Sequence, residues 1–171
     1  VLSGLKANTR YTYRLSMQTT SGTLISSAYT FTTAKPTGST FTFTLQADSH
    51  LDENSDLAVY KQTLGNILFD QPDFHIDLGD TFMTEKYSEP LSPTLQAATN
   101  ADIVNQRYIY ERNNFGLISH SSPLFLVNGN HDGELGWMLN GTKNSLPVWA
   151  TSARQTYFAN FTISYGYFPC K

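Results

Sequence analysis

The segment PLFLVNGNHDGE, residues 123–134, runs from an apolar stretch into a cluster of polar side chains. The apolar stretch ends at Val127, and Asn130, His131 and Asp132 then stand between two glycines. A short apolar run of this kind is typical of a buried strand, and glycine allows a tight turn at its end. A Gly-Asn-His-acid string is expected by chance in about one chain in a thousand at average residue usage. The segment therefore predicts a strand that presents an amide, an imidazole and a carboxylate at its end.

Two earlier strands and two helices fit the same layer. Residues 41–47 (FTFTLQA) and 73–80 (DFHIDLGD) are predicted strands, and residues 81–100 are a predicted long loop. Residues 54–70 predict a helix capped by Asn54 or Ser55, with one apolar face made by Leu57, Tyr60, Leu64, Ile67 and Leu68. Residues 101–116 predict a second helix, while 134–158 have no clear pattern. Strands that alternate with helices at this spacing indicate an α/β fold with parallel strands.

Each of the three predicted strands ends in polar residues: Asp48-Ser49-His50, Gly79-Asp80 and Gly129-Asn130-His131-Asp132. Because ligands of an open parallel sheet collect at the carboxyl ends of its strands, we expect these three ends to lie together. Asp48 and His50 are two residues apart and can point to the same side. Their oxygen and nitrogen atoms suit Zn, Fe or Mn. Asp80 can join two cations through its two oxygens, and a cation would offset the repulsion between Asp48 and Asp80.

The first 34 residues have a different character. Tyr11, Tyr13, Leu15 and Met17 alternate with polar residues, and a second strand-like run covers residues 25–33. The two runs predict a hairpin. GLKANTRYTYRL and SAYTFTTA resemble the last two strands of a fibronectin type III domain, an all-β sandwich whose earlier strands are absent from this sequence. Any edge hairpin of a larger sheet is the alternative. Residues 35–40 (KPTGST) have the composition of a linker.

Asp-x-His, Gly-Asp and Gly-Asn-His-Asp, in this order at strand ends, resemble the calcineurin-like metallophosphoesterases. With the fibronectin-like segment in front, the nearest relatives are similar to purple acid phosphatases and their bacterial counterparts. The likeness covers roughly residues 41–160. It implies that residues 41–171 form the N-terminal part of a metallophosphoesterase domain, a β-sandwich with flanking helices that is present here only in part.

The resemblance also implies roles for single residues. It assigns Asp80 as the bridge between two divalent or trivalent metal ions, Asp48 and His50 as ligands of the first ion, and Asn130 as a ligand of the second. The ions would be Fe, Zn or Mn. His131 would face the phosphate and stabilise or protonate the leaving oxygen. For Asp132 two roles stay open: orienting His131 for catalysis, or serving as a simple acid of the turn.

Two departures from the family pattern matter. In the purple enzymes a tyrosine stands three residues after the bridging aspartate, and the first motif is of the Asp-x-Gly type. Met83 takes the place of the tyrosine here and His50 ends the first motif, so no iron–tyrosinate chromophore is expected. The family also has a downstream Gly-His-x-His motif, whereas no histidine follows His131. We therefore expect the chain to be a fragment of a longer protein, cut at both ends and inactive by itself.

The predicted function is metal-dependent hydrolysis of phosphoric esters at a dinuclear centre, with a metal-bridging hydroxide as nucleophile. The alternative is a non-catalytic binding or adhesion protein with a degenerate phosphoesterase domain. A nuclease of the same superfamily is weakened by the net charge of -3 and the lack of a basic patch, so no nucleic-acid partner is expected. No apolar run approaches the roughly 20 residues of a membrane span. The fibronectin-like segment suggests a secreted or extracytoplasmic protein. The resemblance to the phosphoesterases implies a phosphorylated small molecule or another phosphoester as substrate.

Other polar and aromatic residues are assigned structural roles. His75 and Asp77 share one side of the second strand and are predicted to be packed there, while His120 is a predicted loop residue. Trp137 and Trp149 are predicted core residues. Arg154 and Lys143 are cations within possible reach of an anionic substrate. Two glycosylation sequons occur, at 140–142 and 160–162, and have meaning only in a secreted eukaryotic protein.

Overall fold

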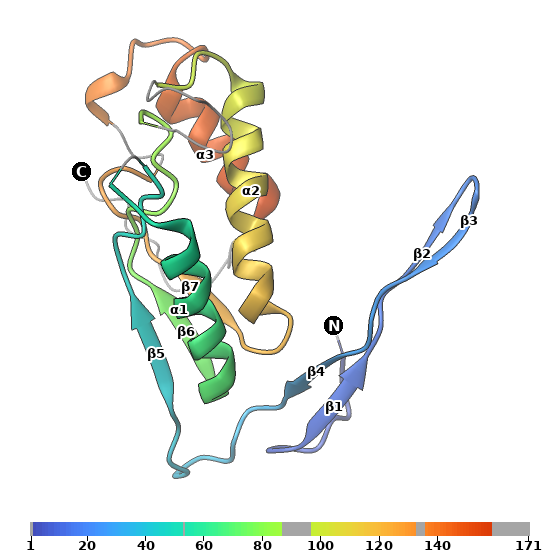
Figure 1. Cartoon of the computed structure of the whole chain (residues 1–171). Helices are drawn as coiled ribbons and strands as arrows, with labels where there is room; N and C mark the ends of the chain where they lie inside the picture. The colour runs from blue at the N-terminus through green and yellow to red at the C-terminus, as the bar shows by residue number, and fades with distance from the viewer. Residues whose placement is uncertain (1, 53, 87–96, 133–135, 159–171) are drawn as a thin grey trace.

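The computed structural model describes residues 2–52, 54–86, 97–132 and 136–158. A long hairpin extends from an α/β unit in which helices lie beside a small sheet (Figure 1). None of the described helices is long and apolar enough to cross a membrane. The elements are β1 (Arg10–Tyr13), β2 (Ser16–Thr19), β3 (Gly22–Ile25), β4 (Tyr29–Thr32), β5 (Phe43–Gln46), α1 (Leu57–Asp70), β6 (Phe74–Asp77), α2 (Ala101–Ser119), β7 (Leu124–Leu126), the 3-10 turn η1 (Gly136–Met138) and α3 (Leu146–Tyr157).

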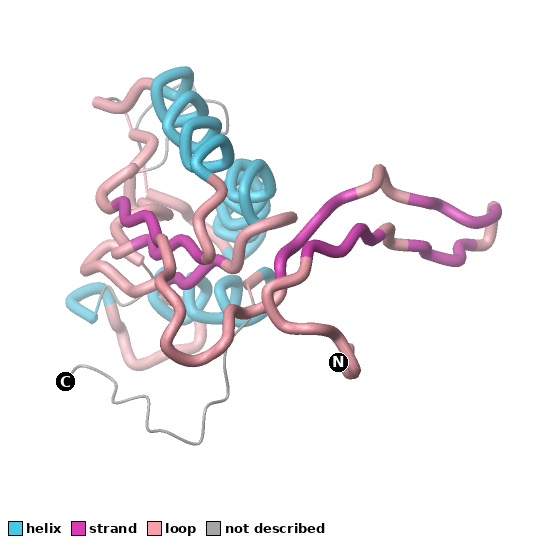
Figure 2. Tube along the Cα trace, turned by 90° about the horizontal axis from the view of Figure 1, so that it is seen from below, coloured by secondary structure: helices cyan, strands magenta, loops and turns pink. Residues whose placement is uncertain are grey.

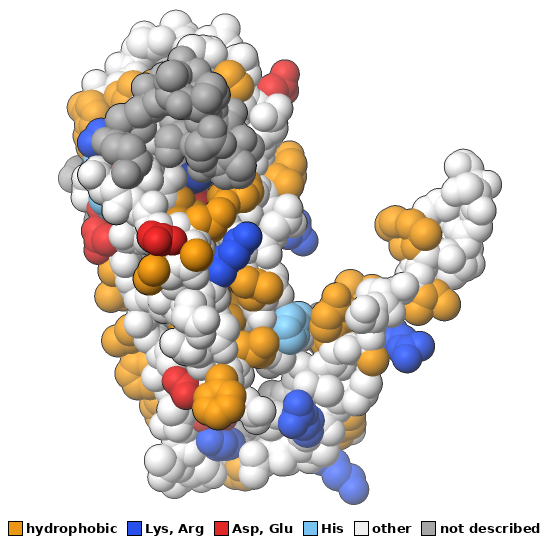
Figure 3. Space-filling view, in the orientation of Figure 1, with side chains coloured by type: hydrophobic (Ala, Val, Ile, Leu, Met, Phe, Trp, Pro, Cys, Tyr) orange, Lys and Arg blue, Asp and Glu red, His pale blue; other side chains and the backbone are white. Residues whose placement is uncertain are grey.

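The predicted hairpin is confirmed, although each of its arms is broken into two short strands. β1 pairs with β4 and β2 with β3, both antiparallel, and the Tyr11 and Phe31 rings stack in register. The hairpin projects away from the helices (Figure 2) and contacts them through Tyr13, whose hydroxyl donates to the His120 carbonyl at 2.8 Å. Hydrophobic side chains are exposed along it (Figure 3). Met17 and Leu24 are each 58% exposed. The fibronectin type III assignment and the domain boundaries stay predictions.

The three-stranded sheet is parallel, as the alternation of elements predicts. Its order is β5-β6-β7, so the strand between the two helices in sequence lies at the centre. The face beneath the helices carries polar side chains that pair across the strands: Thr44 with His75 at 2.8 Å, and Gln46 with Asp77 at 2.8 Å. His75 and Asp77 are fully buried, which confirms the packed roles predicted for them. Burial lowers the pKa of His75, so the imidazole is neutral in this layer.

The opposite face of the sheet carries apolar side chains that remain open to solvent. Phe43 stacks on Phe74 with ring centroids 5.3 Å apart, and Phe125 meets Phe74 edge-on at 5.7 Å. Phe43 and Phe125 nevertheless remain 44% and 40% exposed. The α/β unit therefore has helices on one face of the sheet only, as far as the described residues show.

Helix α1 begins at Leu57, three residues after the start of the predicted range. Asp56, rather than Asn54 or Ser55, is the N-cap, and its carboxylate accepts from the N–H groups of Ala58 and Val59 at 2.8 and 3.2 Å. Asp56 is the N-cap because its carboxylate satisfies two free N–H groups of the first turn at once. The apolar face is buried as predicted and packs against α2 and the sheet, through Tyr60, Leu64 and Ile67.

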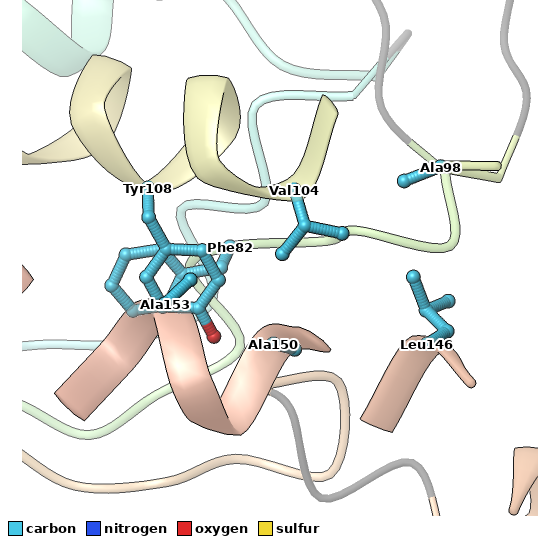
Figure 4. Packing of buried hydrophobic residues seen from close by; sticks show 7 residues of the cluster. All are labelled: Phe82, Ala98, Val104, Tyr108, Leu146, Ala150 and Ala153. Carbon is cyan, nitrogen blue, oxygen red and sulfur yellow. The ribbon is translucent and has the colours of Figure 1, made fainter. Parts of the chain in front are cut away.

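Helix α2 ends at Ser119, three residues beyond the predicted range, and α3 was not predicted at all. Figure 4 shows the cluster between them, where the Phe82 ring stacks on Tyr108 with centroids 4.1 Å apart. Trp149 is partly buried against this cluster. The prediction that Trp137 is a core residue is wrong: it is 64% exposed, because it lies on η1, a short turn in which no residue is buried.

Candidate metal centre

The turns that follow β5, β6 and β7 meet at one edge of the sheet, as expected for the carboxyl ends of parallel strands. The N–H of Asp48 donates to the Gly79 carbonyl at 2.9 Å, and the N–H of His50 donates to the Asp80 carbonyl at 3.1 Å. The third turn joins through His131, whose N–H donates to Oδ1 of Asp80 at 2.8 Å. Asp80 therefore lies at the centre of the three turns.

Asp48, His50 and Asp80 form a group that could hold a metal ion, with one ligand atom from each lying within 4.8 Å of the others. Nε2 of His50 is 3.6 Å from Oδ1 of Asp48. This nitrogen is buried, yet it has no hydrogen-bond partner. A buried polar atom without a partner is costly, and a cation between the imidazole and the two carboxylates would remove that cost. The donor set fits Zn, Fe or Mn.

Asn130 and His131 lie beside this group in the turn after β7. Asn130 is exposed, and its role as a ligand of a second ion stays a prediction. The His131 ring lies 5.8 Å from the His50 ring, between centroids, and 6.2 Å from the exposed ring of Trp137. Nδ1 of His131 contacts the Glu85 carboxylate. This contact directs the other ring nitrogen, Nε2, away from Glu85.

Asp132 does not face the same space as its neighbours. Its side chain is 1% exposed and accepts four hydrogen bonds from backbone N–H groups. The donors are Asp80 at 2.5 Å, Thr81 at 2.8 Å, Phe82 at 2.9 Å and Gly129 at 3.1 Å. The carboxylate therefore ties the turn after β6 to the turn after β7. This placement favours a role in holding the turns, while a catalytic role for Asp132 stays a prediction.

The two glycines of the motifs are required because the turns touch through their backbones. Gly79 has φ +102°, and a Cβ at this position would overlap the backbone of Gly129. A Cβ on Gly129 would in turn overlap the side chain and N–H of Asp80. Any larger residue at either position would push the second and third turns apart and displace the carboxylate of Asp80.

Several residues of these turns adopt left-handed backbone conformations. Of the seven non-glycine residues with positive φ in the described chain, five belong to the turns after β5 and β6, at φ values of 39° to 55°: Asp48, His50, Leu51, Asp80 and Met83. Such conformations cost on the order of 1–3 kcal/mol each and persist where the surroundings enforce them. Strain of this kind clusters at functional sites, which supports the assignment of these turns as the site.

Acidic groups are also buried behind the turns, on the helix side of the sheet. Asp77 accepts from the Thr81 hydroxyl at 2.7 Å and from the Gly79 N–H at 3.0 Å, and its burial raises its pKa. Glu111 of α2 is fully buried, which raises its pKa to about 7, although Arg107 at 3.3 Å opposes that shift. Of the two, Asp77 supports the backbone of the turn after β6 through the Gly79 N–H.

Two residues near the site were not predicted from the sequence. Glu85 lies five residues after Asp80 in a loop without periodicity, so nothing in its neighbourhood singles it out. Arg107 lies in a predicted helix, and a signal for it did exist. Arg107 and Glu111 lie on one buried face of the helix with Val104. Charged residues are rarely buried unless they are paired, so this pair was a visible signal. The predicted cation Arg154 donates to the Leu126 carbonyl at 2.9 Å, away from the three ligands.

The solved structure of a purple acid phosphatase isolated from yellow lupin (Lupinus luteus) seeds is similar to this chain, with a TM-score of 0.62 and 20% sequence identity. The match covers 93% of this chain but only 27% of the lupin chain. No protein-family model matches the sequence, and the comparison with curated proteins finds no match. At this identity the likeness shows the fold alone: a parallel sheet with flanking helices, consistent with part of a phosphoesterase fold.

Proposed function

We propose that this chain carries part of the active site of a metal-dependent hydrolase of phosphoric esters. The observation that carries the proposal is the Asp48-His50-Asp80 group at the carboxyl edge of a parallel sheet, with His131 in the adjoining turn. The similarity to a purple acid phosphatase supports the same class of reaction at the level of the fold.

The residues divide into metal ligands and groups that act on the substrate. Asp48 and His50 would bind one ion, Asn130 a second, and Asp80 would join the two through its pair of oxygens. When bound, the two ions would supply Lewis-acid chemistry: they would lower the pKa of a water molecule to give a hydroxide nucleophile and would bind the phosphate oxygens. The donor set alone does not distinguish Fe, Zn and Mn.

His131 is proposed as the group that meets the leaving oxygen. With Nδ1 against the Glu85 carboxylate, the imidazole is held so that Nε2 can donate a proton to the departing alkoxide. Asp132 is proposed as a positioning residue that acts through the backbone of the turns rather than on the substrate. The phosphoester substrate would enter from the side of Asp48 and Asn130, which are exposed, whereas His131 is half-buried.

Metal binding is the first test, made on the protein expressed from its complete gene because this chain spans only 27% of the solved chain that it matches. Isothermal titration with Mn²⁺ should show saturable binding, which Asp80→Asn should abolish. The control is Asp56→Asn at the N-cap of α1, which removes an acid of the same kind away from the turns and should leave Mn²⁺ binding unchanged.

Hydrolysis is tested on the protein expressed from its complete gene, because this chain spans only 27% of the solved chain that it matches. The probes are p-nitrophenyl phosphate and bis(p-nitrophenyl) phosphate with Mn²⁺, Zn²⁺ or Fe, which separate monoester from diester activity. Hydrolysis that is lost in His131→Ala supports the proposal. Metal binding without hydrolysis of either ester would refute it and favour a non-catalytic binding protein.

A further inference from the structure

We infer that Arg107, on helix α2, is a positioning residue for the metal centre: its guanidinium holds the two ligand-bearing turns in the conformation that brings Asp48, His50 and Asp80 together. The inference rests on the proposed function, since it assumes that these three residues bind metal. It assigns Arg107 no contact with the substrate or with the ions.

The first argument is the set of partners that the guanidinium reaches. Nη2 of Arg107 donates to the carbonyl of the proposed ligand His50 at 2.6 Å, in the turn after β5. Nε donates to the carbonyl of Phe82 at 2.7 Å, in the turn after β6, and Nη2 lies 3.5 Å from the carbonyl of Thr81. One side chain therefore bridges two turns that are about thirty residues apart in the sequence, and both turns carry proposed metal ligands.

The second argument is that Arg107 is fully buried, at 1% exposure. A buried guanidinium is costly unless it is paired and hydrogen-bonded. Glu111, one turn along α2, lies 3.3 Å from Nη2 and is also fully buried. Helix α2 needs no charged pair at this position to pack, because Val104, Tyr108, Phe115 and Ile118 supply its apolar contacts. The contacts of the guanidinium with the two turns, rather than helix packing, therefore explain the buried pair.

The third argument is that Arg107 and Asp132 bind complementary backbone groups of the same turn. The Asp132 carboxylate accepts hydrogen bonds from the N–H groups of Thr81 and Phe82. The Arg107 guanidinium donates to the carbonyls of the same two residues. This turn contains left-handed backbone at Asp80, which needs surroundings that enforce it. The turn of His50 is joined to this turn by the N–H of His50 on the Asp80 carbonyl, and Arg107 adds a side-chain link through the His50 carbonyl.

Lysine cannot replace the guanidinium in this role. Arginine donates from a rigid planar fork, whereas lysine presents a single ammonium on a flexible chain. Arg107→Lys keeps the charge beside Glu111 but cannot reach the carbonyls of His50 and Phe82 with a fork. Changes to groups that orient metal ligands weaken metal affinity by about 10- to 100-fold. We expect Arg107→Lys to weaken Mn²⁺ binding by a factor in this range.

The experiment compares Arg107→Lys with Ile118→Ala, a buried apolar change eleven residues further along the same helix. Both variants should lose thermal stability, since both alter buried side chains. Isothermal titration with Mn²⁺ should then separate them, with weakened binding in Arg107→Lys and wild-type binding in Ile118→Ala. Native-state hydrogen exchange gives a second readout, in which the amides of Asp48 and His50 should exchange faster in Arg107→Lys without metal.

Each outcome decides the matter. If the wild-type protein expressed from its complete gene binds no Mn²⁺, the proposed function fails and the inference fails with it. If the wild type binds and Arg107→Lys binds equally well, the inference alone is overturned. Equal weakening in both variants would also overturn it, because a general loss of stability would then explain the result. If Arg107→Lys does not fold, Glu111→Gln replaces it, since this variant keeps the guanidinium but removes the carboxylate that orients it.

Discussion

Replacing Asp132 by asparagine should destabilise the protein although the shape of the side chain barely changes. Oδ2 accepts from the N–H groups of Asp80 and Gly129, and Oδ1 accepts from those of Thr81 and Phe82. An amide keeps only one accepting oxygen and points an NH₂ group at the other pair of donors. Two backbone N–H groups are then left without an acceptor in a site that water does not reach.

The size of the effect follows from those two donors. Each buried polar group without a partner costs about 1–3 kcal/mol, so Asp132→Asn should lower the free energy of unfolding by about 2–6 kcal/mol. Urea unfolding followed by circular dichroism measures this change, and the slope of the transition should stay constant. Asp56→Asn is the matched control. Asparagine is as good an N-cap as aspartate, so this variant should stay within about 0.5 kcal/mol of the wild type.

A loss below about 1 kcal/mol in Asp132→Asn would refute the reasoning, because the amide would then satisfy the donors as well as the carboxylate does. The same variant also tests the role of the turns. If Asp132 holds Asp80 in place, its Mn²⁺ affinity should fall together with its stability. If Asp132→Asn lowers the free energy of unfolding by the predicted amount but leaves the Mn²⁺ affinity unchanged, the turn keeps its shape without the carboxylate.

Three further predictions concern the glycines, a buried acid and a helix end. Gly129→Ala should lower both the melting temperature and the Mn²⁺ affinity because its Cβ overlaps Asp80, whereas Gly116→Ala, which meets open space on α2, should stabilise the chain by about 0.5–1 kcal/mol; equal effects would contradict the close approach of the turns. Burial raises the pKa of Glu111 from 4.5 to about 7, so the folded chain holds a proton that the unfolded chain releases over that range. Stability should therefore fall as the pH rises from about 4.5 to 7, by on the order of 3 kcal/mol, and melting curves of Glu111→Gln should lack this part of the pH dependence. Gln71→Gly should raise the free energy of unfolding by about 0.5–1 kcal/mol, since the C-cap of α1 has φ 49°, and a loss measured by urea unfolding would argue against strain at this position.

The sequence alone predicted the order of the α/β elements and the meeting of their ends. Apolar runs and helical periodicity are local signals, and they placed β5, β6, β7, α1 and most of α2 correctly. The convergence of Asp48, His50 and Asp80 followed from one general property, since parallel strands present their carboxyl ends at one edge. Helix α3 was missed although its Ser145 N-cap and Pro147 near the first turn were visible, because its apolar pattern is short and mixed.

Only the tertiary structure decided what each polar side chain of the site does. Spacing cannot show that His131 meets Glu85 while the next residue, Asp132, turns inward to four backbone N–H groups. Nor can it show that Arg107 reaches across to His50, or that Trp137 is exposed. The direction of a turn side chain depends on the local φ and ψ angles and on which donors lie within reach. Here most of those donors belong to residues about fifty positions away, brought near by the pairing of the strands.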